Sequence, residues 1–400
     1  MGWKTMDVRQ QRVEFVVAAS RREKAFGQLC AEFGISRPTG YLWCKRYRSG
    51  GLEAIAEQSR KPHKSPSRTA LSVEQQVVSL WQRYPDWGAR KLGFRLEEQS
   101  GLQLPSSTVH RILRRHNLVE RRQQRSQPYQ RFERSQPNEL WQMDFKGPRG
   151  WKEPVGPLSI LDDHSRYLIG LQALGSTQAE LVREQLEEAF QRCGVPEAML
   201  MDHGIPWWGA HSPLGLTRLS VWLMRQGIQL YWSGLRHPQT QGKVERFHGA
   251  LEMARRRRGL PEAAKRQLWL DEFRHEYNHV RPHEALGMRT PASIWYPSAR
   301  RYDPHPLGWQ YPEGSEVRTL ESNGRLWLDG RLWQIAGPLA GEQVQLVPVE
   351  KRVLVFYRKT LIRELNFTPR QQGKDGGSAA LENAPRFPLS PATAAATDDR

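Results

Sequence analysis

The segment that decides the fold reads LWQMDFK and occupies residues 140–146. Its apolar and aromatic residues favour a β-strand, and Asp144 lies in the middle of that strand. A strand interior is a costly place for an unpaired carboxylate, which must be paired, protonated or bound to metal there. The segment therefore predicts a strand whose acid needs a partner.

Short apolar runs and helical patterns alternate downstream of this segment. Strands are expected at residues 158–161, 167–171, 198–201 and 228–232, and helices at about 177–192, 216–226 and 242–258. The order strand-strand-strand-helix-strand-helix-strand-helix is typical of a mixed sheet flanked by helices. Residues 137–300 are therefore assigned to one α/β core.

Two further carboxylates stand at informative places in this pattern. Asp202 follows the expected strand at 198–201, and Glu245 lies on the helix after the polar loop 237–242. Carboxylates are hard oxygen donors suited to Mg²⁺ or Mn²⁺, and two such ions about 4 Å apart can assist phosphodiester chemistry. Spacing alone leaves open the alternative that the three acids are unrelated surface residues.

Five motifs around these acids resemble those of the integrase-like DDE transposases of bacterial insertion sequences. The motifs are WQMDF at 141–145, LDDHSRY at 161–167, DHG at 202–204, HPQTQGKVERFH at 237–248 and YNHVRPHEAL at 277–286. The similarity is greatest to the insertion-sequence four-eight-one group and covers most of residues 10–300.

The resemblance implies a fold, a site and a reaction. The fold is a ribonuclease H-like core, and the catalytic and metal-binding triad falls on Asp144, Asp202 and Glu245. The implied cofactor is two Mg²⁺ ions, with Mn²⁺ as a substitute, and the implied reaction is the cleavage and transfer of DNA strands. Pairing of two transposon ends implies a homo-oligomer, at least a dimer, on DNA.

The sequence departs from the family pattern at two points. The family usually has Asn after the second acid, where this chain has His203. The second and third acids are separated by more residues than in retroviral integrases, and the excess falls near 207–211, where a loop insertion would leave the sheet intact. A catalytically inactive, transposase-derived DNA-binding regulator is the alternative function, and His203 is the nearby residue that favours it.

Two further acids within the motifs are weaker candidates for metal ligands. Asp162 and Asp163 are expected to cap a turn with Ser165 and Arg166 rather than to bind metal.

Three residues on the helix of Glu245 leave two interpretations open. Lys243 and Arg246 flank Glu245 and either contact the phosphates of the transposon end or form a solvated helix face. His248 lies one turn later on the same face, so it either reaches the site or stays on the surface.

The N-terminal residues 1–58 have the pattern of a helix-turn-helix DNA-binding domain. Residues 25–33 place apolar side chains on one helical face, and Ser36 with Pro38 can start a second helix that ends at Gly50. This second helix carries residue types that contact bases and phosphates from the major groove. The candidate DNA-binding residues on it are Arg37, Thr39, Lys45, Arg46 and Arg48.

A second helical DNA-binding domain is expected at residues 70–118, between a basic linker at 59–69 and a basic connector at 119–136. Ser72 is its expected N-cap, with Gln75 as a capping-box partner. Residues 109–116 alternate an apolar face with arginines, as in a recognition helix. The candidate DNA-binding residues here are Arg90, Lys91, Arg111, Arg114 and Arg115.

The C-terminal residues 301–366 contain β-rich runs separated by Asn-Gly and Asp-Gly turns. This pattern predicts a small all-β, SH3-like barrel. Residues 367–400 are rich in Gly, Ala, Ser and Pro and are expected to form a disordered tail.

Composition agrees with a nucleic-acid partner and excludes other classes. The 400 residues carry a net charge of +18, of which residues 1–135 contribute +14. No apolar run is long enough for a membrane span, so we expect a cytoplasmic protein without a membrane partner. The three cysteines form no Cys-x-x-Cys pair, which predicts buried thiols and no zinc module.

Overall fold

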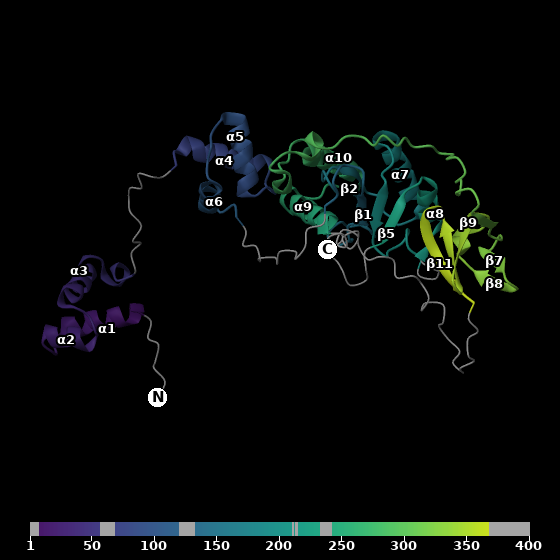
Figure 1. Ribbon diagram of the computed structural model, residues 1–400. Coiled ribbons are helices and arrows are strands. Elements are labelled where there is room, and N and C mark those ends of the chain that lie inside the picture. Colours follow the sequence, from purple (N-terminus) through teal and green to yellow (C-terminus); the bar gives the residue numbers. More distant parts are fainter. Residues whose placement is uncertain are drawn as a thin grey trace, which may run out of the picture. The chain divides into compact units, whose positions relative to one another are not determined.

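The computed structural model describes residues 8–56, 69–119, 133–209, 212, 215–232 and 242–367 (Figure 1). The chain divides into two compact units, Met1–Ala70 and Leu71–Arg400. Most of the expected basic linker and connector, the polar loop before Glu245 and nearly all of the expected tail lie outside the described residues.

The first unit is a three-helix domain with its own core. Its helices are α1 (Val8–Arg21), α2 (Phe26–Glu32) and α3 (Arg37–Ala54). The Ser36 side chain caps α3 by accepting a hydrogen bond from the Thr39 amide, as the sequence predicts, and helical geometry is broken at Gly50 and Gly51. A Cβ at Gly40 would lie 2.8 Å from Phe15 and Cys30, so this glycine lets α3 approach the other helices closely.

The second unit begins with a helical module of α4 (Leu71–Arg83), α5 (Ala89–Ser100) and α6 (Ser106–Arg115). These helices share a core that includes Leu80, Leu92 and Ile112. The prediction for Ser72 is wrong in detail, because α4 already starts at Leu71 and Ser72 is inside the helix.

A buried ionic cluster joins this helical module to the α/β core. Asp86, in the turn before α5, has a fully buried side chain. Arg281 Nη1 lies 2.6 Å from Asp86 Oδ2, and Arg258 Nε donates to Asp86 Oδ1 at 2.8 Å. Arg258 also pairs with Glu276 at 2.7 Å, and Glu276 accepts a hydrogen bond from the Trp87 indole.

The α/β core is built on a five-stranded mixed sheet. Its strands are β1 (Trp141–Phe145), β2 (Leu158–Asp162), β3 (Leu168–Gln172), β4 (Ala198–Met201) and β5 (Gln229–Trp232). The order is β3-β2-β1-β4-β5, with β2 antiparallel to both β1 and β3 and with β4 parallel to both β1 and β5. This topology confirms the predicted mixed sheet, with all five expected strands present.

Helices cover both faces of this sheet (Figure 1). On one face, α7 (Ala179–Cys193) and α8 (Arg218–Arg225) pack against Trp141, Met143 and Met199. On the other face, α9 (Gly242–Arg258) and α10 (Ala263–His279) pack against Leu161 and neighbouring strand residues. Alternate residues of β1 therefore face opposite helix layers, because successive side chains in a strand point to opposite sides. Helix α10 was not among the expected elements.

The C-terminal region is all β, as predicted. It consists of β6 (Glu316–Thr319), β7 (Arg325–Leu328), β8 (Arg331–Gln334), β9 (Gln343–Val349), β10 (Arg352–Tyr357) and β11 (Thr360–Asn366). Four strands form a sheet of order β11-β10-β9-β6, and β7 and β8 form a separate hairpin. The expected Asp329-Gly330 turn closes this hairpin, with φ of 51° and 73°. The sequence did not predict β11.

Two further expectations concern cysteines and membranes. Cys30, Cys44 and Cys193 are free and buried, as predicted. Within the part of the chain that the structure describes, no helix has the length and apolar character needed to cross a bilayer.

Candidate active site

Asp144 and Asp202 lie side by side near the C-terminal ends of the neighbouring inner strands β1 and β4. The parallel register of β1 and β4 pairs Trp141 with Met199 and Gln142 with Leu200. Continued by two residues, this register sets Asp144 beside Asp202, which directly follows β4. The structure thus brings together two acids that are far apart in the sequence.

The environment of Asp144 disfavours its charged form. Burial, together with the neighbouring negative charges of Asp202 and Glu245, raises the pKa of this carboxyl to about 7. The side chain is still 21% exposed. A carboxylate with this electrostatic environment would be stabilised by a cation placed between it and its acidic neighbours.

Asp202 is oriented by two hydrogen bonds from the chain that follows it. Its Oδ1 accepts from the Gly204 amide at 2.9 Å and from Trp207 Nε1 at 2.7 Å. The Trp207 ring is buried and stacks on Phe145 of β1, with centroids 5.6 Å apart. Trp207 therefore connects the two strands that carry the acids.

Trp207 was not identified as a site residue from the sequence. It lies in the segment where the sequence indicated an insertion, and the strands on either side of that insertion pair as expected. The His203 ring, the family departure, contacts the next tryptophan, Trp208, at 4.3 Å between centroids. The tryptophan pair Trp207 and Trp208, shortly after Asp202, was the sequence signal that could have identified this site residue.

Glu245 lies in the first turn of α9 and is exposed. Its negative charge is one of the causes that raise the pKa of Asp144. Among the described residues, however, no three His, Cys, Asp or Glu side chains lie close enough together to hold a metal ion. That Glu245 completes a three-carboxylate site stays a prediction.

His248 reaches the site, which settles the alternative left open by the sequence. Its Nδ1 lies 3.6 Å from Asp144 Oδ2, and its Nε2 is 3.0 Å from Ser159 Oγ on β2. Burial lowers the pKa of His248 to about 3, so the ring is neutral at physiological pH. His248 therefore lies against the Asp144 carboxyl without adding a positive charge there.

The residues present fit a hard divalent cation in their chemistry. Asp144 and Asp202 supply carboxylate oxygens, the donors that Mg²⁺ and Mn²⁺ prefer, and no thiol is placed among them by the structure. Burial is the main cause of the raised pKa of Asp144, and repulsion from Asp202 and Glu245 adds to it; a bound cation would relieve that repulsion.

The expected turn residues have structural roles. Asp162 Oδ1 accepts hydrogen bonds from the Ser165 amide and hydroxyl at 2.8 and 2.5 Å, and Asp162 O accepts from the Arg166 amide. This confirms the turn predicted for Asp162. Asp163 differs, because its fully buried carboxylate points instead to Gln142 and Lys243.

The two basic residues beside Glu245 have different surroundings. Lys243 is only 15% exposed, and its ammonium lies 2.5 Å from Asp163 Oδ2. Burial lowers the pKa of Lys243 to about 8, against the opposing effect of Asp163. Arg246 is exposed. Arg246 is thus better placed than Lys243 for a phosphate contact.

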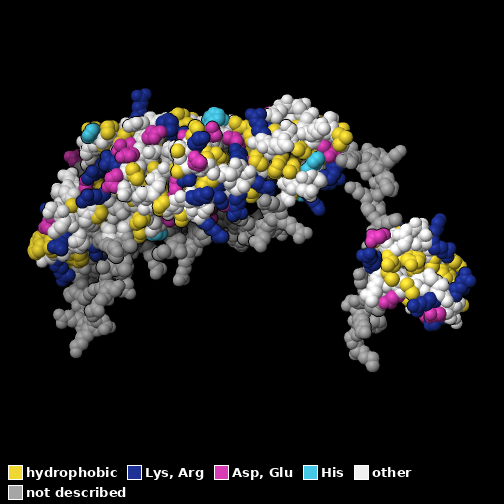
Figure 2. Space-filling view, turned by 180° about the vertical axis from the view of Figure 1, so that it is seen from behind, with side chains coloured by type: hydrophobic (Ala, Val, Ile, Leu, Met, Phe, Trp, Pro, Cys, Tyr) yellow, Lys and Arg dark blue, Asp and Glu magenta, His cyan; other side chains and the backbone are white. Residues whose placement is uncertain are grey.

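Candidate DNA-binding residues on α3 form a largely exposed basic face. Arg37, Lys45 and Arg48 are exposed, whereas Thr39 is partly buried and its hydroxyl bonds to Ser36. Arg46 is partly buried, with its guanidinium 4.9 Å from the centre of the Trp43 ring. Figure 2 shows Lys and Arg side chains spread around this N-terminal unit, with few Asp and Glu.

The basic residues of the α4–α6 module differ in their exposure and in their acidic partners. Arg111, Arg114 and Arg115 on α6 are all exposed, and Arg115 pairs with the buried Glu74 at 2.7 Å. Arg90 is exposed and lies 2.9 Å from Glu284. Burial lowers the pKa of Lys91 to about 7, so this lysine is a poorer phosphate contact than its charge suggests.

Four family models match parts of the chain. A helix-turn-helix domain matches residues 11–63, and a homeodomain-like domain matches 39–113. Two integrase core domain models match residues 134–238 and 226–291.

Several known proteins are similar to parts of this chain. The chain is 24% identical over 222 residues to an uncharacterized 31.7 kDa protein of insertion element IS407 from Burkholderia multivorans, covering 51% of this chain and 76% of the relative. It is 30% identical over 89 residues to protein YlbG of Escherichia coli, covering 22% and 72%. The HTLV-2 integrase catalytic core in complex with magnesium aligns with 14% identity and a TM-score of 0.31, over 40% of this chain and 97% of that one.

The fold and the paired acids define a ribonuclease H-like integrase core preceded by helix-turn-helix domains. Integrase core domain models thus match residues 134–291 of this chain in two overlapping segments, and one of the similar proteins is an uncharacterized protein of an insertion element.

Proposed function

We propose that this chain is a DNA transposase that binds the terminal inverted repeats of an insertion sequence, cleaves their 3′ ends and joins them to target DNA. The observation that carries the proposal is the pairing of β1 with β4, which sets Asp144 beside Asp202 within an integrase core. The ordered motifs around both acids and Glu245 support it.

The chain's own residues would prepare the acids for this reaction. Divalent cations, Mg²⁺ or Mn²⁺, would be held by Asp144, Asp202 and Glu245 and would supply the Lewis acidity that activates an attacking oxygen and stabilises the leaving one. Trp207 and the Gly204 amide fix the orientation of the Asp202 carboxylate. The neutral His248 of α9 lies beside Asp144, and such neighbouring contacts tune ligand carboxylates.

DNA recognition would be divided between two helical domains. The exposed basic side chains of α3 in the first unit and of α6 in the second suit contacts with phosphates and base edges. Synapsis of two element ends calls for at least a dimer on DNA, in the cytoplasm where bacterial DNA lies.

A strand-transfer assay with divalent metal and duplexes that carry the inverted repeats flanking the gene tests the proposal. We expect the wild-type chain to join these ends to target DNA and Asp144→Asn to be inactive. Asp329→Asn is the matched control, because Asp329 is exposed in a distant hairpin turn that Asn also favours.

Two results would refute the mechanism or the function. Equal activity of Asp144→Asn and wild type would remove Asp144 from the reaction. Specific binding of the repeats by a wild-type chain that neither cleaves nor joins them would favour the alternative, a DNA-binding regulator descended from a transposase.

A further inference from the structure

We propose that Gln142, Asp163 and Lys243 form a latch that holds the first turn of α9 against the sheet and thereby positions Glu245. The inference rests on the proposed function in one respect, the role of Glu245 as the third acid. Lys243 then acts as a positioning residue through its contact with Asp163.

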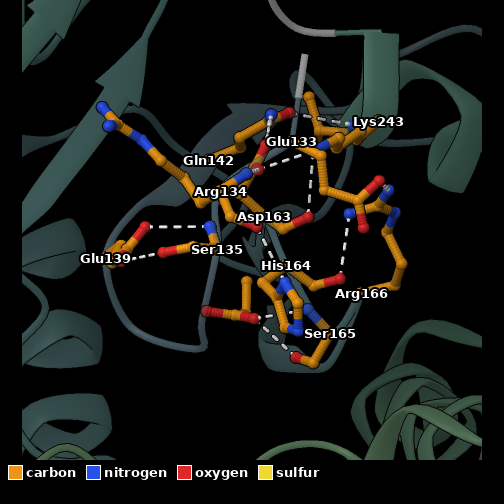
Figure 3. A network of polar contacts seen from close by, with 12 residues as sticks. Glu133, Arg134, Ser135, Glu139, Gln142, Asp163, His164, Ser165, Arg166 and Lys243 are labelled. Atoms are coloured by element: carbon orange, nitrogen blue, oxygen red, sulfur yellow. Dashed lines mark hydrogen bonds and ion pairs between the residues drawn. The ribbon is translucent and has the colours of Figure 1, made fainter. Parts of the chain in front are cut away.

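Asp163 is the centre of the latch (Figure 3). Its side chain is fully buried just after β2, and both carboxylate oxygens accept hydrogen bonds. Oδ1 accepts from Gln142 Nε2 at 2.8 Å, whereas Oδ2 accepts from the Arg134 amide at 2.9 Å and from Lys243 Nζ at 2.5 Å. Lys243 Nζ also donates to the Asp163 carbonyl oxygen at 3.0 Å.

Gln142 connects this centre to the backbone of α9. It lies on β1 with a fully buried side chain, and its Oε1 accepts a hydrogen bond from the Val244 amide at 3.3 Å. The first amides of a helix have no partner within the helix, so this contact satisfies one of them. Val244 directly precedes Glu245, and the latch therefore holds the helix at the residue next to the acid.

The latch and the acids lie on the same side of the sheet. Residues two apart on a strand point to the same face, so Gln142 and Asp144 of β1 both face the α9 layer. Met143 between them packs in the opposite layer with α7 and α8. Strand β1 thus carries both Asp144 and Gln142, whose hydrogen bond to the Val244 amide holds the helix of Glu245.

The chemistry of the latch specifies one arrangement of α9. Apolar contacts of Val244 and Phe247 tolerate small shifts of a helix, because they have no directional requirement. A buried carboxylate requires its donors in fixed positions, since losing one partner leaves an uncompensated buried charge. The polar network therefore specifies one position for the first turn of α9, the turn that carries Glu245.

Hydrogen exchange of the full-length chain without DNA or metal tests the latch independently of activity. Lys243→Met keeps the length of the side chain and removes its charge. We expect amide exchange in residues 242–248 to rise at least tenfold, with the exchange of β3 and α10 unchanged as a check on folding. Lys243→Arg retains a cation for Asp163 and should keep most of the protection.

Lys265→Met is the matched control, because Lys265 is exposed on α10 and is not part of the site. It should leave exchange in residues 242–248 unchanged. An equally unchanged result for Lys243→Met would overturn the latch. This outcome does not depend on strand transfer, so the latch and the proposed function fail separately.

DNA binding distinguishes a positioning role of Lys243 from a direct phosphate contact. For a latch, Lys243→Met should lower the rate of strand transfer while the affinity for the element ends and its salt dependence stay the same. If Lys243 instead contacts a phosphate, affinity should fall and the salt slope should decrease by about one. That second pattern would also overturn the proposal.

Discussion

Asp86 offers the sharpest test of how the helical module is attached to the core. Its carboxylate is fully buried between the guanidinium groups of Arg281 and Arg258, which are 6% and 20% exposed. Asp86→Asn keeps the size of the side chain but removes the charge, so two largely buried cations lose their shared partner. Breaking such a buried pair costs about 3–5 kcal/mol.

This loss is large enough to measure as a shift in thermal unfolding. For domains of 150–250 residues, 1 kcal/mol corresponds to about 2–4 °C, so a midpoint lower by roughly 6–20 °C is expected. Circular dichroism at pH 7 measures this shift, and limited proteolysis should show earlier cleavage between α6 and β1. Glu97→Gln removes one charge from an exposed position of the same module and should shift the midpoint little.

The pH dependence provides a second check on the same residue. Burial raises the pKa of Asp86, but the adjacent Arg281 and Arg258 outweigh it, and the net pKa is below the ordinary value. A lowered pKa means that the stabilisation is complete above the unfolded pKa, about 3.9, and is lost as the pH falls through the folded value. The difference between wild type and Asp86→Asn should therefore be constant from pH 6 to 8 and shrink below about pH 4.

A small effect would refute this reasoning. If Asp86→Asn lowered the free energy of unfolding by less than about 1 kcal/mol at pH 7, the pair would behave like an exposed salt bridge. The attachment of α4–α6 would then depend on other contacts.

Three further predictions concern the site and the first unit. Trp207→Phe keeps the stacking on Phe145 but removes the donor to Asp202, so strand transfer should slow by about 10–100-fold with unchanged affinity for DNA. Lys45→Ala should weaken DNA binding and decrease its salt slope by about one, as measured by fluorescence anisotropy, if α3 contacts phosphates. Ser36→Ala removes the cap of α3 and should cost about 1 kcal/mol, as measured by urea unfolding of the first unit's helices.

Local patterns in the sequence predicted most elements of the core because those patterns depend on neighbouring residues. Apolar runs identified the five strands of the sheet, Ser36 marked the start of α3 correctly, and Gly50 marked the break in its helical geometry. Ser72 was wrong as an N-cap, because a serine near a helix start fits several positions of the first turn. Helix α10 was missed although Leu270, Phe273 and Tyr277 repeat at helical spacing.

The sequence by itself indicated the class of the protein and predicted the acids of its site. Motifs around Asp144 and Asp202 are contiguous, so they can be recognised without knowing how the chain folds. Only the tertiary structure decided which side chains support these acids. The contact of Lys243 with Asp163 joins residues 80 positions apart, and that of Arg281 with Asp86 spans 195. Burial of such charged groups follows from the packing of distant segments, which no local pattern of residues encodes.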